Sequence, residues 1–301
     1  MGAPLVIGVD VGGTKILSGV VDRDGNVLGR NLVESPGTSE EDVLGALDAS
    51  VEALLDERVG AIGLGVPANL DRATGRVLRA TNLPLDDFDL AQHARSRFGL
   101  PVAVENDANA AALAEWKLGA GKGLASLVML TLGTGVGGGI VLDGRLFRGW
   151  AEIGHMVVQV GGPPCQGNCH GRGHLEALAS GSAADRIAQE LWGQQADSRT
   201  LVERARAGVD EALGALDEVA EALGAAIGSL ANLFDPELVI VGGGFGEAVA
   251  DLVLGPAQEA ARRQALAPAD GTLRVVPASL GEDAGLVGAG LVGFEALDGA
   301  W

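Results

Sequence analysis

The chain has 301 residues, of which 47% are hydrophobic and 20% are charged, and its formal net charge is −19. This length allows two domains with sizeable cores, and the composition is that of an ordinary soluble globular protein. So acidic a chain argues against nucleic acid or an anionic membrane as a partner. We recognise no signal peptide in the first residues, and no apolar run reaches the roughly 18 residues of a membrane span. The two cysteines make a poor disulfide framework and a plausible metal pair, so we expect a cytoplasmic protein.

The first 34 residues predict three antiparallel strands. Apolar runs occupy residues 4–10, 16–21 and 27–34, and the second and third are joined by the hairpin turn R-D-G-N. A tight turn at Gly12 and Gly13 follows the first run, with Thr14 and Lys15 after it. Such turns point backbone N–H groups and a hydroxyl at an anion, although an ordinary hairpin would have the same sequence.

The next segment alternates helices and buried strands. Residues 39–58 predict a helix with an N-cap serine, 59–67 a buried strand, and 68–75 a loop. A short helix at 90–98 precedes the strand P-V-A-V-E-N-D, and an Ala-rich helix follows. Ligands of open α/β sheets bind outside the carboxyl ends of strands, so Glu105, Asn106 and Asp107 are well placed for a site.

Residues 124–146 repeat the opening pattern. A buried strand leads into G-T-G-V-G-G-G, and a second strand and a D-G turn follow, which suggests a duplicated β-meander in two related domains. Further on, the sequence predicts helices at 179–191, 197–231 and 246–266. Strands are expected to end in the glycines at 242–244 and to span 272–280.

Three glycine turns follow buried strands, and none matches the P-loop or the dinucleotide-binding pattern. Each turn alone is a weak signal, but together they indicate nucleotide binding. Two such turns can hold a polyphosphate tail while the third lies under a nucleoside. Asp107 could accept the proton of a sugar hydroxyl as it attacks phosphorus. The alternative for Asp107 is an Asx turn or a helix N-cap.

The stretch from Trp150 to Gly181 holds both cysteines and three of the four histidines. Thiolates and imidazoles are good zinc ligands, and a site with four protein ligands is structural rather than catalytic. We therefore predict a structural Zn2+, although scattered surface histidines and free thiols remain the alternative. The candidate ligands are His155, Cys165, Cys169 and His174, with His170 as a fifth.

Several motifs resemble the ROK family of sugar kinases and repressors, most closely its bacterial glucokinase-like members. They are D-V-G-G-T-K at 10–15, G-V-P-A-N-L-D at 65–71, V-E-N-D-A-N-A-A at 104–111 and L-G-T-G-V-G-G-G-I at 132–140. The pattern continues with A-E-I-G-H-M at 151–156 and with the cysteine–histidine segment 165–176. One departure concerns the metal: the family usually has cysteine where this chain has His174, and glycine or proline at His170.

The resemblance implies an α/β, actin-like (ribonuclease H-like) two-domain fold with an interdomain cleft. It implies a small domain of residues 1–116, on which a closing helix at about 288–301 packs back, and a larger domain of residues 117–287. It further implies a hexose and ATP with Mg2+ near Asp10 as ligands, and Asp107 as general base. The implied sugar contacts are Asn69, Asn82, Asn106, Asp107, Glu152, His155 and Glu176. The implied nucleotide contacts are Asp10, Gly12, Gly13, Thr14, Lys15, Gly133, Thr134, Gly135, Gly242, Gly243 and Gly244.

The expected activity is therefore an ATP-dependent glucokinase of glycolysis that phosphorylates the 6-hydroxyl. Alternatives that keep the fold are kinases for mannose, fructose, N-acetylmannosamine or N-acetylglucosamine, and polyphosphate could replace ATP as the donor. A non-catalytic sugar-sensing protein is a further alternative, but a repressor needs a DNA-reading module, and the first strand here begins by residue 4. Homodimers or homotetramers are expected from the family.

Overall fold

The computed structural model describes residues 4–35, 37–80 and 82–300. The chain forms two compact units, which we call unit 1 and unit 2. Unit 1 holds the chain up to Leu118 together with the segment from Asp283 onward, and unit 2 runs from Gly119 to Glu282. Among the helices of the described ranges, none has the length and apolar character needed to cross a membrane.

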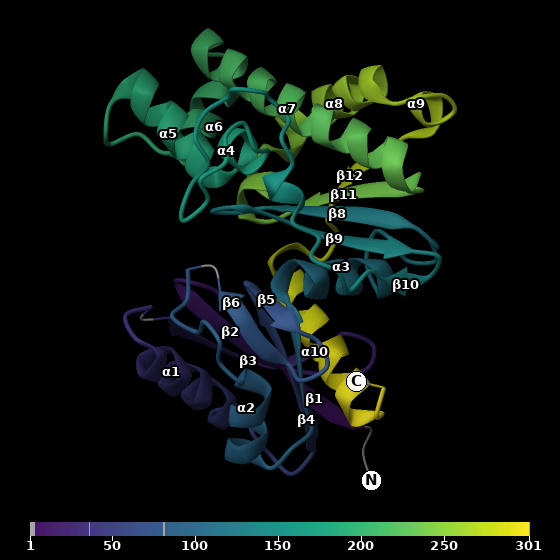
Figure 1. The fold of residues 1–301 in the computed structure, drawn as a ribbon. Helices are drawn as coiled ribbons and strands as arrows, with labels where there is room; N and C mark the ends of the chain where they lie inside the picture. Colours follow the sequence, from purple (N-terminus) through teal and green to yellow (C-terminus); the bar gives the residue numbers. More distant parts are fainter. Residues whose placement is uncertain (1–3, 36, 81, 301) are drawn as a thin grey trace. The chain divides into compact units, whose positions relative to one another are not determined.

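Unit 1 is built on a five-stranded sheet in the order β3-β2-β1-β4-β7 (Figure 1). β1 (Leu5–Val11), β2 (Lys15–Val21) and β3 (Val27–Glu34) pair antiparallel, which confirms the predicted meander. β4 (Val59–Val66) lies parallel to β1, and β7 (Val102–Asn106) lies parallel to β4. The carboxyl ends of these three parallel strands therefore meet at one edge of the sheet.

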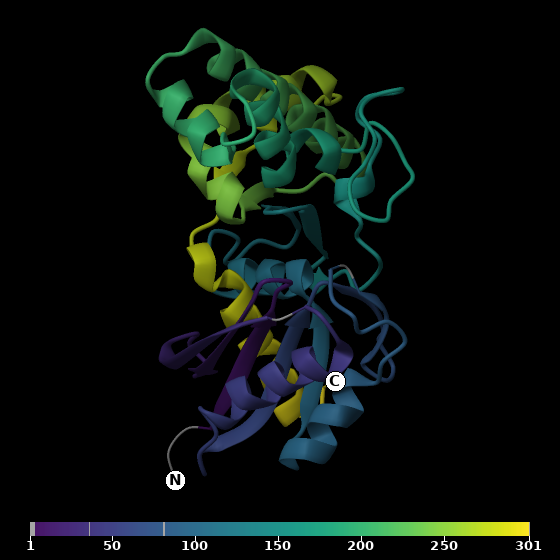
Figure 2. The ribbon, with the colours of Figure 1, turned by 90° about the vertical axis from the view of Figure 1, so that its left-hand side faces the viewer.

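Helices cover both faces of this sheet, because successive side chains of a strand point to opposite faces. Ile7, Val9 and their neighbours form one core with α1 (Glu40–Glu52) and α2 (Leu90–Phe98). The opposite face packs against α3 (Asp107–Lys117) and α10 (Ala284–Leu297). Figure 2 shows α10, in yellow, on the side of the sheet away from α1 and α2.

Glycines bring α10 unusually close to this sheet. A Cβ atom at Gly8 or Gly63 would overlap backbone atoms of α10, and a Cβ at Gly288 would overlap the backbone of α3. Part of the high glycine content, 48 residues, thus serves close packing rather than flexibility.

A two-stranded sheet stands beside the main one in unit 1. β5 (Ala68–Asp71) and β6 (Arg76–Ala80) pair antiparallel, so the prediction of a loop over 68–75 was wrong for its first half. Leu70 and Val77 are buried in the unit 1 core. The hairpin therefore gains apolar burial that a solvated loop would lack.

Unit 2 repeats the sheet order of unit 1. Its five strands run β10-β9-β8-β11-β12, with the β8–β9 and β9–β10 pairs antiparallel and the β8–β11 and β11–β12 pairs parallel. This confirms the duplicated β-meander. The strands are β8 (Leu127–Leu132), β9 (Val136–Leu142), β10 (Arg145–Leu146), β11 (Leu238–Gly242) and β12 (Val275–Pro277).

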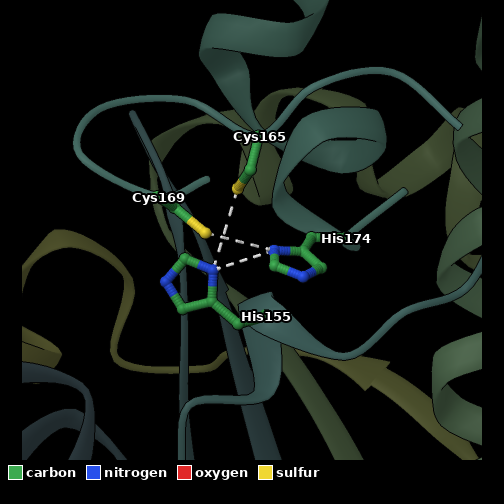
Figure 3. Close-up of side chains that lie close together, drawn as sticks. All are labelled: His155, Cys165, Cys169 and His174. Atoms are coloured by element: carbon green, nitrogen blue, oxygen red, sulfur yellow. Dashed lines mark hydrogen bonds between the residues drawn. The ribbon is translucent and has the colours of Figure 1, made fainter. Parts of the chain in front are cut away.

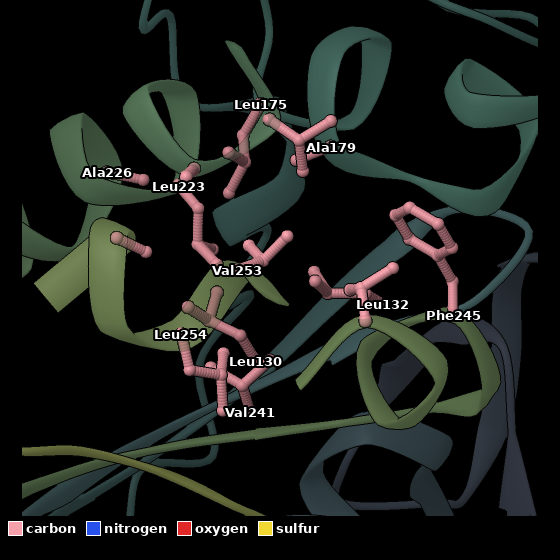
Figure 4. Packing of buried hydrophobic residues seen from close by; sticks show 14 of the residues in the cluster. Leu130, Leu132, Leu175, Ala179, Leu223, Ala226, Val241, Phe245, Val253 and Leu254 are labelled. Atoms are coloured by element: carbon pink, nitrogen blue, oxygen red, sulfur yellow. The ribbon is translucent and has the colours of Figure 1, made fainter. Parts of the chain in front are cut away.

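Helices of unit 2 share one large core with this sheet. Figure 4 shows Leu130 and Leu132 of β8 and Val241 of β11 facing Leu223, Phe245 and Val253 from the helices. The α-helices are α4 (Glu176–Ala179), α5 (Gly181–Trp192), α6 (Ser198–Arg206), α7 (Asp210–Phe234), α8 (Gly244–Gln264) and α9 (Ala269–Thr272). Two short 3-10 helices are η1 (Ile153–His155) and η2 (Gly281–Asp283).

Several predicted ends of elements were wrong. α1 stops at Glu52 rather than near Arg58, because Asp56 accepts a hydrogen bond from the Arg58 backbone N–H (2.7 Å) in a turn. The helix predicted over 197–231 is divided into α6 and α7, since Gly208 takes a left-handed φ of 78°. β12 covers only three residues of the strand predicted at 272–280 and ends at Pro277, which has no N–H to donate.

Candidate active site and metal centre

Two carboxylates of unit 1 meet at the carboxyl ends of the parallel strands. Asp10 stands near the end of β1 and pairs with Gly65 of β4, while Asp107 opens α3 directly after β7. A Cβ at Gly65 would lie 3.7 Å from the Cα atom of Asp107, so Asp107 lies next to the strand residue that pairs with Asp10. The structure thus brings together the residue predicted as the base and the residue predicted near the magnesium ion.

Asp10 has an unusual titration. Burial, and next the negative charge of Asp107, raise the pKa of Asp10 from 3.8 to about 7, while Lys15 opposes the rise. The first turn of α10 also crowds the carboxylate, because a Cβ at Gly285 would lie 2.6 Å from Asp10 Oδ2. A bound cation would favour the charged form against burial, so this carboxylate is suited to hold one.

The N-cap of α3 is Asn106 and not Asp107. Asn106 Oδ1 accepts a hydrogen bond from the backbone N–H of Asn109 (3.1 Å). Asp107 is the first helical residue, is partly exposed, and accepts a bond from its neighbour Ala108 N–H (2.8 Å). The helix therefore does not need the Asp107 carboxylate as its cap, which removes one of the alternatives to a catalytic role.

Glu105 supports this loop from inside the protein. Its side chain is fully buried and accepts hydrogen bonds from the backbone of Asn106 (2.9 Å), the amide of Asn109 (3.1 Å) and the guanidinium of Arg72 (3.3 Å). Glu105 stands near the strand end where the sequence predicts a site, and its carboxylate is directed to the backbone behind Asn106 and Asp107. The pairing with Arg72 could not be read from the sequence, because the two residues lie 33 positions apart.

The first glycine turn joins β1 to β2 in unit 1. Gly12 N–H donates to Lys15 O (2.9 Å), and Ser35 N–H donates to Thr14 O (2.9 Å). Asn82, with a left-handed φ of 62°, lies against Gly13, where a Cβ would stand 3.3 Å from the Asn82 Cβ atom. The structure therefore groups Asn82 with this turn. Asn69 is partly buried in β5.

The second glycine turn, Gly133, Thr134 and Gly135, joins β8 to β9 in unit 2. Gly133 N–H donates to Gly135 O (2.9 Å), and Gly181 N–H donates to Gly133 O (2.7 Å). Glu176 Oε2 accepts from the N–H of Val136 (2.9 Å), the residue that follows the turn. This turn is thus held by the first residue of α5 and by the carboxylate predicted to bind sugar.

The third glycine segment starts α8 beside the second turn. Gly243 has a φ of 83°, and a Cβ there would lie 2.7 Å from Leu132 O, one residue before the second turn. A Cβ at Gly242 would lie 2.8 Å from the side chain of Ala278, so packing explains these two glycines. Gly244 borders open space, and the N–H groups of the first helical turn are suited to polar ligand atoms.

Four predicted metal ligands form one cluster in unit 2 (Figure 3). One ligand atom from each of His155, Cys165, Cys169 and His174 lies within 4.8 Å of the other three. The two Nδ1 atoms are 3.3 Å apart, and the Sγ–Nδ1 distances are 3.7 Å for Cys165–His155 and 3.5 Å for Cys169–His174. A zinc tetrahedron with its usual bond lengths has edges of about 3.3 Å for N–N and about 3.6 Å for N–S. The donor set and its spacing fit zinc.

Backbone hydrogen bonds bring these ligands together from distant positions. Leu175 N–H donates to Met156 O (2.9 Å) and Cys165 N–H donates to Gly171 O (2.9 Å), which sets the two ends of the loop side by side. Gly171 N–H also donates to Cys169 Sγ (3.4 Å). Burial, and next a hydrogen bond with Cys169, raise the pKa of Cys165 to about 11. A cation is what would favour the thiolate form.

The remaining predicted residues of this region have distinct positions. His155 directs Nδ1 into the cluster, which leaves Nε2 on the far edge of the ring (Figure 3). Glu152 is exposed just before η1. His170 is exposed and is not among the four clustered residues.

Sequence reasoning missed Gln166. Its Nε2 donates to Thr134 O (2.9 Å). This bond connects the loop that carries Cys165 and Cys169, which we call the metal loop, to the second glycine turn. A polar residue next to Cys165 gave no signal of this contact, because such residues are usually solvated.

Comparison with known proteins agrees with the motifs. The ROK family model matches residues 6–293. The glucokinase of Thermotoga maritima is 38% identical over 98% of this chain and 98% of its own, and that of Streptomyces coelicolor is 38% identical over 95% and 96%. A ROK family glucokinase from Streptomyces griseus, solved in complex with glucose and AMPPNP, is 37% identical and has a TM-score of 0.86 over 97% of this chain and 99% of its own. The predicted actin-like α/β fold is confirmed, and the chain belongs to the ROK family.

Proposed function

We propose that this protein is an ATP-dependent glucokinase that transfers the γ-phosphoryl group of ATP to the 6-hydroxyl of glucose. Its glucokinase relatives and the neighbour that holds glucose and AMPPNP support this activity. The observation that carries the proposal within this chain is the partly exposed carboxylate of Asp107 beside Asp10. Phosphoryl transfer to an alcohol needs a group that accepts the hydroxyl proton and charges that hold the phosphates.

In this mechanism Asp107 accepts the proton of the attacking hydroxyl group. Asp10 would hold Mg2+, which would supply positive charge against the transferring group. Backbone N–H groups of the two glycine turns contact the phosphates, and the start of α8 lies under the nucleoside. The residues assigned to the nucleotide are Gly12, Gly13, Thr14, Lys15, Gly133, Thr134, Gly135, Gly242, Gly243 and Gly244.

The residues proposed to contact the sugar carry mainly amides and carboxylates. Amides both donate and accept hydrogen bonds and carboxylates accept them, which suits the hydroxyl groups of a hexose. The residues assigned to the sugar are Asn69, Asn82, Asn106, Asp107, Glu152, His155 and Glu176. We propose that units 1 and 2 are the small and the large domain expected from the sequence.

We assign a structural Zn2+ to His155, Cys165, Cys169 and His174. Four protein ligands leave no open coordination position, so the metal would hold the loop and take no part in the chemistry. Ligation through His155 Nδ1 would place the ring proton on Nε2, which can then donate to a sugar hydroxyl. The tetrahedral spacing of the four ligand atoms supports this assignment.

A coupled assay of ADP production tests the activity. Glucose should give a higher kcat/KM than mannose, fructose, N-acetylmannosamine or N-acetylglucosamine, and ATP should exceed polyphosphate as donor. Zinc content is measured on the same sample. The Asp107→Asn variant should lose turnover, whereas Asp24→Asn, at an exposed position of unit 1, should not. ADP release that does not depend on any sugar would refute the proposal.

Location and assembly complete the proposal. Cys165 and Cys169 form no disulfide, which together with the use of ATP suits the reducing cytoplasm, and a place in glycolysis follows from the reaction. Light scattering on the purified protein tests the expected homodimer or homotetramer.

A further inference from the structure

The peptide that joins Thr134 to Gly135 has its orientation set by the metal loop. Gln166 lies directly after Cys165, and its Nε2 donates to Thr134 O (2.9 Å). The Gln166 carbonyl in turn accepts from the N–H of Cys169 (3.3 Å). The Gln166 backbone is thus fixed between two of the four metal-ligand residues, and its side chain reaches from there to the glycine turn.

This contact decides where the turn presents a donor. A trans peptide is planar, with its C=O and N–H pointing in opposite directions. Since the Thr134 carbonyl is held toward Gln166, the N–H of Gly135 points to the other side of the turn. Glycine tolerates many backbone conformations, so a peptide next to Gly135 can reorient at little cost unless something holds it.

The neighbouring peptides of the turn have anchors of their own. Gly181 N–H donates to Gly133 O (2.7 Å), and the N–H of Val136 donates to Glu176 Oε2 (2.9 Å). A side chain at Gly135 would collide with Glu176, so this position stays glycine and keeps its freedom. Gln166 therefore supplies the side-chain hydrogen bond that locks the central peptide.

We propose that Gln166 is a positioning residue: it locks the Thr134–Gly135 peptide so that the Gly135 N–H faces the phosphates of the nucleotide. It also links the metal centre to the nucleotide, since a metal held by Cys165 and Cys169 fixes the backbone on both sides of Gln166. The inference rests on the proposed function, which assigns phosphates to this turn. It predicts that loss of Gln166 weakens the binding of the nucleotide and leaves the binding of the sugar unchanged.

The test compares Gln166→Ala and Gln166→Glu with Asn168→Ala, an exposed carboxamide in the same loop. Calorimetry measures the binding of AMPPNP with Mg2+ and, separately, of glucose, and metal content is measured for each protein. Both Gln166 variants should bind AMPPNP about tenfold more weakly, the loss of one well-placed hydrogen bond. Gln166→Glu should bind AMPPNP at least as weakly as Gln166→Ala, because glutamate keeps the size of glutamine but presents an acceptor to the Thr134 carbonyl. Glucose affinity, metal content and the Asn168→Ala protein should match the wild type.

Chelation provides a second readout. Removing the metal should weaken AMPPNP binding to the wild type. The same treatment should weaken AMPPNP binding to Gln166→Ala by a smaller factor, because this variant already lacks the hydrogen bond that connects the metal loop to the turn. AMPPNP binding within twofold of wild type in both Gln166 variants would overturn the inference. Equal losses for glucose and AMPPNP, or loss of metal from the variants, would also overturn it, since they would indicate a loosened loop. A further outcome separates the inference from the proposed function. If the wild-type protein shows no kinase activity, but the Gln166 variants still bind AMPPNP more weakly than it does, the inference stands and the proposed function is refuted.

Discussion

Asp10 is expected to lower the stability of the folded protein at neutral pH and above, where its carboxylate is ionised and can hold a cation. Burial and the charge of Asp107 raise its pKa from 3.8 to about 7. Each pKa unit corresponds to about 1.4 kcal/mol, so the ionised carboxylate costs up to about 4 kcal/mol of folding stability. Asp10→Asn removes this charge and keeps nearly the same shape.

The size of this destabilisation depends on pH. Below about pH 4 the carboxyl group is neutral in both the folded and the unfolded chain, and Asp10 contributes no pH dependence. Between about pH 4 and pH 7 the unfolded chain loses this proton while the folded chain keeps it, so stability falls as pH rises. Above pH 7 the folded state carries the full cost of the buried charge.

Unfolding of the wild type and of Asp10→Asn at several pH values tests this reasoning, in buffer without Mg2+ or nucleotide. The advantage of the variant should grow by about 2–3 kcal/mol between pH 5 and pH 8. Taking the difference between the two proteins cancels the titration of shared groups that do not interact with Asp10. Mg2+ with ATP should narrow the gap, because binding stabilises the wild type. The variant should nevertheless lose most of its turnover. A stability difference that does not change with pH would refute the argument.

Three further changes are expected to have distinct effects. Asp107→Asn should lower kcat about 10²–10⁴-fold, the usual range for a general base, with glucose affinity by calorimetry unchanged; near-normal turnover would end its assignment as base. Cys169→Ser should lose bound zinc by elemental analysis and lower the melting temperature by several degrees; retained metal would point to another ligand set. Gly63→Ala should cost about 1–3 kcal/mol in urea unfolding, because its Cβ would overlap α10, whereas Gly45→Ala in α1, where a Cβ meets open space, should be neutral or stabilising. Equal effects at the two glycines would contradict the packing argument.

The sheets and their turns were predictable because their signals are local. Alternating and continuous apolar runs mark strands, and the glycine pairs after Asp10 and Leu132 mark the turns. The β5–β6 hairpin was not predictable in the same way. Its strands are short, and what stabilises them is the burial of Leu70 and Val77 in a core assembled from distant segments.

For the candidate site, residue types were easier to predict than their partners. The sequence supplied five possible metal ligands, and the fold brings His174 to the cluster through pairing with Val157 while His170 stays exposed. Arg72 and Gln166 escaped notice because their roles come from contacts made across the fold. Secondary-structure reasoning has no access to such long-range hydrogen bonds.

The repeated sheet has an acid at one strand position of unit 1 and a hydroxyl at the matching position of unit 2. Asp10 is the last residue but one of β1 and pairs with Gly65, and Thr131 is the last residue but one of β8 and pairs with Gly242. The two positions thus have the same surroundings in strand order and in their glycine partner. In unit 1 a carboxylate there suits a cation and lies beside a second acid, Asp107. In unit 2 the same position holds the hydroxyl of Thr131, which carries no charge for a cation, although it stands two residues before Gly133 as Asp10 stands two residues before Gly12.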